Sequence, residues 1–326
     1  MYQVEKASGN PPLSTHTSAP LTLISQGGGI GGGAYVVGVM KALKELGALV
    51  YVTRTITSSA GTPAVLYPLL GKDSFAEHVW TQEVTRPEVV NRSVRRFLQG
   101  HPLLDIDYLV DEILTQHPFD SDAFHRHVVT MDMSVTSLSK KNTEDGREEN
   151  CLALENMLLS NRDPYDPLTM IKASIAIPAV YGRIVSVGDG VYVDGGITSQ
   201  LPHHYAGREA KIVILTEPSR GDFRKSPAEE ALLFFCENQG WLQPELRHAI
   251  QSRHLLYRAE YARLGQREDQ GETIIRLAPK QPLRAGVLCH KPLIVHATIE
   301  QGYTETMQEY RKIEAVLQQL ELKYAG

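Results

Sequence analysis

The sequence has little that would support a disulfide framework, a metal cluster or a nucleic-acid surface. Its 326 residues include three cysteines, Cys151, Cys236 and Cys289, an odd number spread far apart. Such a pattern fits a reducing compartment and forms neither a disulfide framework nor a metal-ligand motif. No run of five like charges occurs and the formal net charge is −5. We therefore expect no nucleic-acid partner, no metal ion and no cofactor.

An uninterrupted apolar run is also missing. Residues 21–40 carry no charge and have the length of a membrane span, but they contain seven glycines together with polar residues such as Gln26. This composition favours a buried strand, a glycine turn and the start of a buried helix. Residues 1–20 are rich in Ser, Thr and Pro and have no apolar signal-peptide core. We therefore expect a flexible N-terminal arm and a cytoplasmic protein, with any membrane contact peripheral.

The first seventy residues alternate between strand and helix patterns. Leu21–Ser25 and Leu49–Ile56 read as buried strands, while Ala34–Leu46 and Thr62–Tyr67 read as helices. This order is typical of a parallel sheet with helices on its faces. Further strands are expected at 127–136, 190–193, 211–216 and 272–277, and further helices at 74–84, 107–115, 167–174, 226–266 and 293–322.

These elements predict an α/β fold with three layers, α/β/α, around a central, mainly parallel sheet. We expect a single domain over residues 21–326, because no repeat, low-complexity tract or linker interrupts it. Its core is expected at 21–216, followed by a largely helical part at 217–326. The oligomeric state cannot be read from the sequence.

A glycine-rich segment, residues 26–33 (QGGGIGGG), lies between the first strand and the first helix. Glycines at such a position let successive backbone N–H groups converge on an anion, which is either a phosphate or the oxyanion of an acyl intermediate. Gly27, Gly29 and Gly32 match G-x-G-x-x-G, but residues 48–68 contain no acidic residue to hold a ribose. No Gly-Lys-Ser/Thr ends the segment either, so the pattern fits neither a dinucleotide site nor a P-loop.

A second junction between a strand and a helix carries Thr57-Ser58-Ser59-Ala60-Gly61. Taken alone, this segment is explained at least as well by a helix cap. A nucleophile elbow needs the same arrangement, with a serine on a tight turn and small neighbours. The elbow becomes the better explanation because the glycine segment lies one βαβ unit upstream, which brings both turns to the same edge of the sheet. Only Ser59 precedes Ala-Gly, so Ser58 is the weaker candidate.

A third segment, Tyr192-Val193-Asp194-Gly195-Gly196, ends a strand in an acid and two glycines. Asp-Gly is a common turn signal, so an ordinary turn explains it equally well. As a functional element, Asp194 would act as a general base toward Ser59.

These three segments, in this order, resemble the patatin-like phospholipase family over about residues 20–216. Residues 33–39 (GAYVVGV), 41–43 (KAL) and 173–178 (ASIAIP) add to the resemblance. The resemblance implies a patatin-like fold, a dyad of Ser59 and Asp194 without histidine, and an oxyanion hole from the glycine segment. It also implies a phospholipid or other acyl-ester substrate, hydrolysed as by a phospholipase A, a lysophospholipase or an esterase. We expect Gly28 and Gly29 to donate to the oxyanion, with Gly31 as a third candidate.

The sequence departs from the family pattern at two places. The glycine segment lacks the arginine usual before its last glycine, and Thr57 stands where the elbow usually begins with glycine. A catalytically weak or inactive module that binds a lipid or a protein partner therefore stays open, as does a transacylase. His203 and His204 leave a Ser-Asp-His triad as a less favoured alternative. Arg247, Arg253, Arg258 and Arg263 scatter around a predicted helix, which indicates a solvated face more than a membrane-binding one.

Overall fold

The computed structural model describes residues 20–324 except 117–119, 143–147, 218–226 and 241. Within them the chain forms an eight-stranded sheet in the order β5-β6-β3-β2-β1-β7-β8, with β4 pairing on β3. The strands are β1 (Leu21–Ser25), β2 (Val52–Ser58), β3 (Thr130–Asn142), β4 (Glu148–Ser160), β5 (Val185–Val187), β6 (Gly190–Asp194), β7 (Ala210–Ile214) and β8 (Ile274–Leu277). Pairing is parallel from β3 through β2, β1 and β7 to β8 and antiparallel where β4, β5 and β6 join. The predicted α/β sheet is confirmed, in a mixed form.

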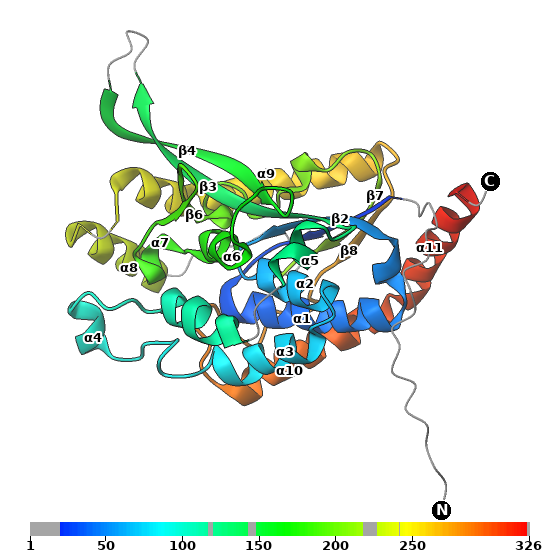
Figure 1. The fold of residues 1–326 in the computed structure, drawn as a ribbon, viewed down its shortest axis with the longest axis horizontal. Helices are drawn as coiled ribbons and strands as arrows, with labels where there is room; N and C mark the ends of the chain where they lie inside the picture. Colours follow the sequence, from blue (N-terminus) through cyan, green and yellow to red (C-terminus); the bar gives the residue numbers. More distant parts are fainter. Residues whose placement is uncertain (1–19, 117–119, 143–147, 218–226, 241, 325–326) are drawn as a thin grey trace, which may run out of the picture.

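Helices cover both faces of this sheet (Figure 1). Both faces of the sheet are apolar and need such cover, as the alternating side chains of β1 show. Leu21 and Leu23 belong to one buried cluster, and Ile24, on the other face, belongs to another. The first cluster packs under α1 (Gly29–Glu45), α2 (Gly61–Leu69), α6 (Pro167–Ile175) and α10 (Pro292–Gln308). On the other face lie α8 (Pro227–Asn238) and α9 (Pro244–Asp269). The three-layer α/β/α arrangement is therefore confirmed.

The remaining helices are short or lie at the end of the chain. They are α3 (Asp73–His78), α4 (Val94–Leu98), α5 (Ser121–His125), α7 (Pro178–Tyr181) and α11 (Tyr310–Tyr324), with 3₁₀ turns at Ala48–Tyr51, Leu114–Gln116, Gly195–Ile197 and His203–Tyr205. Two segments, η2 (Val79–Glu83) and η3 (Tyr108–Ile113), are π-helices. Their wider turn often accompanies functional sites.

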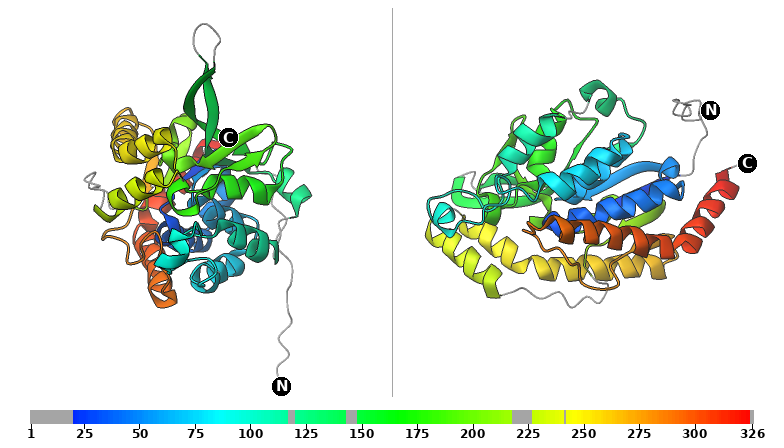
Figure 2. Two further views of the ribbon diagram at one scale, coloured as in Figure 1. Left: turned by 90° about the vertical axis from the view of Figure 1, so that its left-hand side faces the viewer. Right: turned by 90° about the horizontal axis from the view of Figure 1, so that it is seen from below.

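The C-terminal part contributes to the body of the molecule. A Cβ atom on Gly38 of α1 would lie 1.9 Å from the carbonyl oxygen of Ile299, and one on Gly302 would lie 2.2 Å from that of Tyr35. These two glycines let α1 and α10 approach backbone to backbone, side by side (Figure 2). The predicted helical C-terminal region is confirmed, although Glu309 separates α10 from α11.

The structure corrects several expected boundaries. The helix expected from Ala34 begins at Gly29, because Gly28 and Gly29 alone make the turn, with φ of 122° and 60°. No strand was expected at β4, whose sequence mixes charged and apolar residues. The predicted arm over 1–20 falls outside the described residues except for Pro20.

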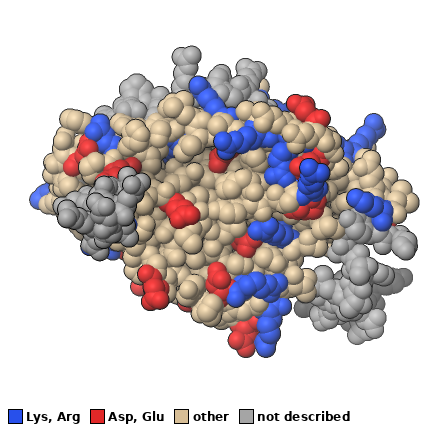
Figure 3. All heavy atoms as spheres, turned by 90° about the horizontal axis from the view of Figure 1, so that it is seen from above, with Lys and Arg blue, Asp and Glu red and all other residues tan. Residues whose placement is uncertain are grey.

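The β3–β4 hairpin extends beyond the rest of the molecule (Figures 1 and 2). Seen from the hairpin side, acidic and basic side chains are interspersed among broad uncharged areas (Figure 3). In the described part of the chain, no helix has both the length and the apolar character that crossing a bilayer requires.

Candidate active site

Ser59 lies on a strained turn between β2 and α2. Its φ is 53°, the single positive value among the described residues other than glycine. Such a conformation costs about 1–2 kcal/mol and persists only where the surroundings impose it. Thr62 N–H donates to Ser59 O at 2.8 Å, so α2 starts directly after the turn and its N-terminus faces the serine. This local geometry is that of a nucleophile elbow.

The first βα turn lies against this elbow. β1 and β2 are parallel neighbours, with Ser25 opposite Thr57. A Cβ atom on Gly27 would lie 2.4 Å from the Cβ of Ser59 and 3.0 Å from its Oγ, so no larger residue fits there. The two junctions that the sequence singled out therefore meet at one edge of the sheet.

Asp194 reaches the same place from the antiparallel part of the sheet. It ends β6 opposite Val135 of β3, and its backbone N–H donates to Ala176 O at 3.0 Å. Ser59 Oγ donates to Asp194 Oδ2 at 2.5 Å, and Gly196 N–H donates to Asp194 Oδ1 at 2.7 Å. Each carboxylate oxygen thus has its own donor, which fixes the orientation of the side chain.

Burial controls the charge of this carboxyl group. Asp194 is 2% exposed. Desolvation raises its pKa to about 6, against the opposing effects of the Ser59 hydroxyl, the Gly196 N–H and the charge of Arg253. A carboxylate with a pKa near the working pH is a far better proton acceptor than a free one. The site therefore has the electrostatics that a general base requires.

The glycine segment divides into two parts by its hydrogen bonds. Ile30 N–H donates to Val287 O at 3.0 Å, and Gly31 N–H donates to Gly286 O at 3.2 Å. Within the described chain, no acceptor takes the N–H of Gly28 or Gly29. Gly31 is therefore removed from the expected donors, because a loop from the C-terminal part occupies its N–H.

A residue that the sequence did not single out, Thr216, holds this turn in place. Thr216, just beyond β7, donates its backbone N–H to Gln26 Oε1 at 3.0 Å and its hydroxyl to Gly27 O at 2.6 Å. Both contacts are buried. A signal existed, since Thr216 is a polar residue directly after a nearly continuous apolar strand, at the edge where ligands bind.

His203 contacts α9. Its Nε2 lies 2.9 Å from Glu260 O, and burial lowers its pKa to about 4. In the part of the chain that the structure describes, Asp194 has no histidine partner, so the geometry gives the triad no support. Glu260 binds Ser199 Oγ and accepts from Leu201 N–H at 3.0 Å, and thereby fixes the segment that follows Asp194.

The four arginines of α9 do not form a common face. Arg258 and Arg263 are exposed, Arg247 pairs with Glu237, and Arg253 acts on the charge of Asp194. The helix packs on the sheet through buried residues that include Leu246, Ile250 and Leu264.

An apolar cavity of about 50 Å³ opens beside Ser59. Ser59 lines this cavity together with Gly29 and Ala60. A second wall of the cavity is formed by Val79, Trp80, Val84, Leu104, Leu109 and Leu114, which lie between α3 and the start of the 3₁₀ turn Leu114–Gln116. The cavity therefore suits the hydrocarbon part of an acyl group whose carbonyl lies at Ser59.

The chain has detectable similarity to known proteins. The chain is 27% identical over 214 residues to the uncharacterized protein YjjU of Escherichia coli; this match covers 64% of the chain and 56% of YjjU, so the chain spans little more than half of that relative. The crystal structure of VipD from Legionella pneumophila aligns with 90% of the chain and 67% of VipD at 14% identity, with a TM-score of 0.42. The family model of the patatin-like phospholipases matches residues 23–206, which include both junctions and Asp194. The chain therefore belongs to the patatin-like phospholipase family.

Proposed function

We propose that this protein hydrolyses acyl esters of lipids, with Ser59 as nucleophile and Asp194 as general base. The observation that supports this most is the 2.5 Å hydrogen bond from Ser59 Oγ to Asp194 Oδ2, made by a serine held at a positive φ. An ordinary helix cap needs neither the strained backbone nor a buried carboxylate with a raised pKa.

The chemistry would follow from these positions. Ser59 Oγ attacks the acyl carbon while its proton passes to Asp194 Oδ2. The bond to the alcohol then breaks, the alcohol takes the proton from Asp194, and the acyl group stays on Ser59 as an ester. Water repeats the sequence with Asp194 as base, which releases the carboxylic acid and restores the serine.

The N–H groups of Gly28 and Gly29 are the proposed oxyanion donors. Both lie at the N-terminus of α1, whose dipole favours negative charge. Each such donor raises the rate by a factor of about 10²–10³, which corresponds to about 3–4 kcal/mol of transition-state stabilisation. The loop from 285 to 287 supports this role, because it occupies the next two N–H groups and thereby anchors the turn.

Contact with a lipid surface would come from an exposed apolar residue beside the glycine turn. Val287 packs against Gly29 and is 44% exposed, so its side chain lies both beside the glycine turn and at the surface. An exposed apolar residue at this place fits a substrate delivered from an interface.

Hydrolysis of 4-nitrophenyl butyrate tests the proposal. The wild type should release nitrophenol, Ser59→Ala should not, and Ser58→Ala should retain activity because the Ser58 hydroxyl makes only a 3.4 Å contact with Ser199 O. Activity that survives in Ser59→Ala would overturn the assignment. A wild type without any esterase activity would favour the non-catalytic, ligand-binding alternative.

A further inference from the structure

The cavity beside Ser59 is small compared with a fatty-acyl chain. An apolar protein cavity of about 150 Å³ holds a benzene ring, which has six carbons. The cavity here measures about 50 Å³, a third of that volume. By this proportion it holds about two carbons beyond the carbonyl. A long acyl chain fits within the cavity only if a wall moves, such as the one that contains Trp80 and Leu109.

Trp80 ties that wall to α1. Its indole N–H donates to Ile30 O at 3.2 Å, and a Cβ atom on Gly33 would lie 2.4 Å from the ring. The ring therefore lies flush on the helix that begins at the glycine turn, and it is 4% exposed. Any outward movement of Trp80 breaks a buried hydrogen bond and this packing.

The backbone further along the wall is tied to α7. Leu103 N–H and Leu104 N–H both donate to Val180 O, at 2.8 and 3.1 Å. Leu104 lines the cavity directly, so its position follows that of α7.

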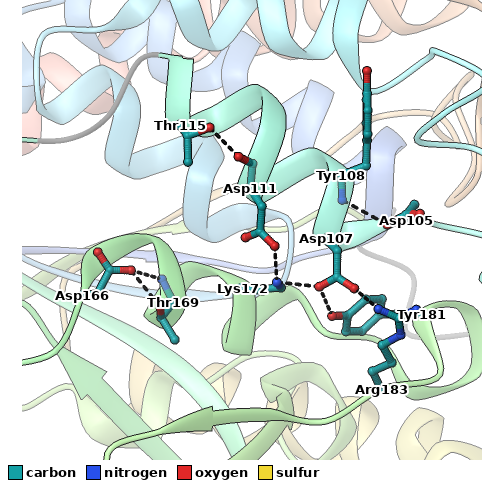
Figure 4. A network of polar contacts seen from close by, with 10 residues as sticks. All are labelled: Asp105, Asp107, Tyr108, Asp111, Thr115, Asp166, Thr169, Lys172, Tyr181 and Arg183. Carbon is teal, nitrogen blue, oxygen red and sulfur yellow. Dashed lines mark hydrogen bonds and ion pairs between the residues drawn. The ribbon is translucent and has the colours of Figure 1, made fainter.

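Charged contacts hold η3, which supplies Leu109 to the cavity (Figure 4). Lys172 of α6 lies between two acids of this segment, 2.5 Å from Asp107 Oδ1 and 2.8 Å from Asp111 Oδ2. Tyr181 OH donates to Asp107 Oδ1 at 2.5 Å, and Arg183 pairs with the other carboxylate oxygen.

Asp107 and Lys172 both stay charged at neutral pH. Burial alone would raise the pKa of Asp107, but hydrogen bonds from Lys172 and Tyr181 outweigh it and lower the pKa. Burial would likewise lower the pKa of Lys172, but its bonds to Asp107 and Asp111 raise it. The wall is thus fixed to α1, α6 and α7, three helices of the sheet's covering layer.

We propose that the site accepts short acyl groups, of about two to four carbons, and that Trp80 and Leu109, which line the cavity, set this limit. This inference rests on the proposed hydrolase function. The substrate class is then an ester in which a short acyl group is attached to a lipid or another alcohol. In the reaction, the short acyl carbon bonds to Ser59 Oγ, the alcohol leaves with the proton from Asp194, and water later releases the short carboxylic acid.

The experiment compares 4-nitrophenyl acetate, butyrate, octanoate and dodecanoate, each below its critical micelle concentration. For the wild type we expect kcat/KM to fall at least about tenfold between butyrate and octanoate, equivalent to about 1.4 kcal/mol. Leu109→Ala and Trp80→Ala should enlarge the cavity, by on the order of 100 Å³ for the leucine, and raise the octanoate-to-butyrate ratio at least about tenfold. Leu293→Ala is the matched control, because Leu293 is 87% exposed and does not line the cavity.

The charged contacts are tested in the same assay. Lys172→Met should raise the octanoate-to-butyrate ratio by loosening η3, whereas Lys280→Met, which removes an exposed lysine paired with Glu309, should not. Phosphatidylcholine with butyryl chains should be cleaved faster than the same lipid with palmitoyl chains. If Trp80→Ala does not fold, the octanoate-to-butyrate ratio of Leu109→Ala alone tests whether the cavity wall limits chain length.

The outcomes separate the two proposals. A wild type that cleaves dodecanoate as fast as butyrate would overturn the inference of a short acyl group. Cavity variants with an unchanged octanoate-to-butyrate ratio would do the same. Either result would leave the hydrolase proposal intact. A wild type that cleaves none of the esters would overturn both.

Discussion

Replacing Asp194 with asparagine separates the catalytic from the structural contribution of this buried carboxylate. Gly196 N–H requires an acceptor at the Oδ1 position, so the amide oxygen of the new side chain stays there and its NH₂ group faces Ser59. The Ser59 hydroxyl then meets a donor and has no group to take its proton. Because general-base catalysis contributes about 10²–10⁴ in rate, we expect Asp194→Asn to lower kcat by that factor, equivalent to about 3–5 kcal/mol.

The same variant should be more stable than the wild type at alkaline pH. The pKa of Asp194 is raised from 3.8 to about 6 on folding, so the folded state holds its proton more tightly than the unfolded state. The contribution of Asp194 to the free energy of unfolding therefore has its full value below the unfolded pKa. It is lost as the pH rises through about 6. Two pKa units correspond to about 3 kcal/mol, and at 2% exposure no solvent screening reduces this.

Urea unfolding at about pH 4 and pH 8 measures this effect. The stability difference between Asp194→Asn and the wild type should increase by about 2.5 kcal/mol between these two pH values, because pH 4 lies just above the unfolded pKa of 3.8. Ester hydrolysis by the same preparations gives the rate. Full activity of Asp194→Asn, or a stability difference that does not change with pH, would refute the reasoning.

Three further predictions follow from the site. The kcat/KM of the wild type should fall as the pH drops below about 6, because protonation of Asp194 removes the base, and a pH–rate profile without this decline would contradict the assignment. Gly27→Ala should lower kcat at least about tenfold, because its Cβ would lie 2.4 Å from that of Ser59, while Gly286→Ala, which meets open space, should keep activity in the same assay. Glu260→Ala should lower the free energy of unfolding by about 2–4 kcal/mol, because the Ser199 hydroxyl and Leu201 N–H lose their buried acceptor, and an unchanged urea midpoint would show that Glu260 does not hold this segment.

The sequence was most informative where chemistry is local. A strand followed by a serine with small neighbours, and a strand followed by Asp-Gly-Gly, each specify a turn within a few residues. Parallel neighbours bring such turns to one edge of a sheet. The structure places the oxygens of Ser59 and Asp194 2.5 Å apart, and their catalytic roles remain predictions.

The parts that depend on distant contacts could not be predicted. Gly31 was a third candidate donor after Gly28 and Gly29, and nothing near it in sequence indicates that Gly286 O occupies its N–H. The cavity wall at Trp80 and Leu109 belongs to π-helical segments, whose period differs from the one that sequence patterns reveal. Residues 285–287 support the glycine turn from more than 250 positions away, which no local pattern encodes.

Labelling with a fluorophosphonate, followed by mass spectrometry of the modified peptide, tests the central claim most directly. A serine activated by Asp194 should react with the probe on the peptide that contains Ser59, and Asp194→Asn should react much more slowly. Absence of labelling in the folded wild type, or labelling of a different serine, would contradict the account.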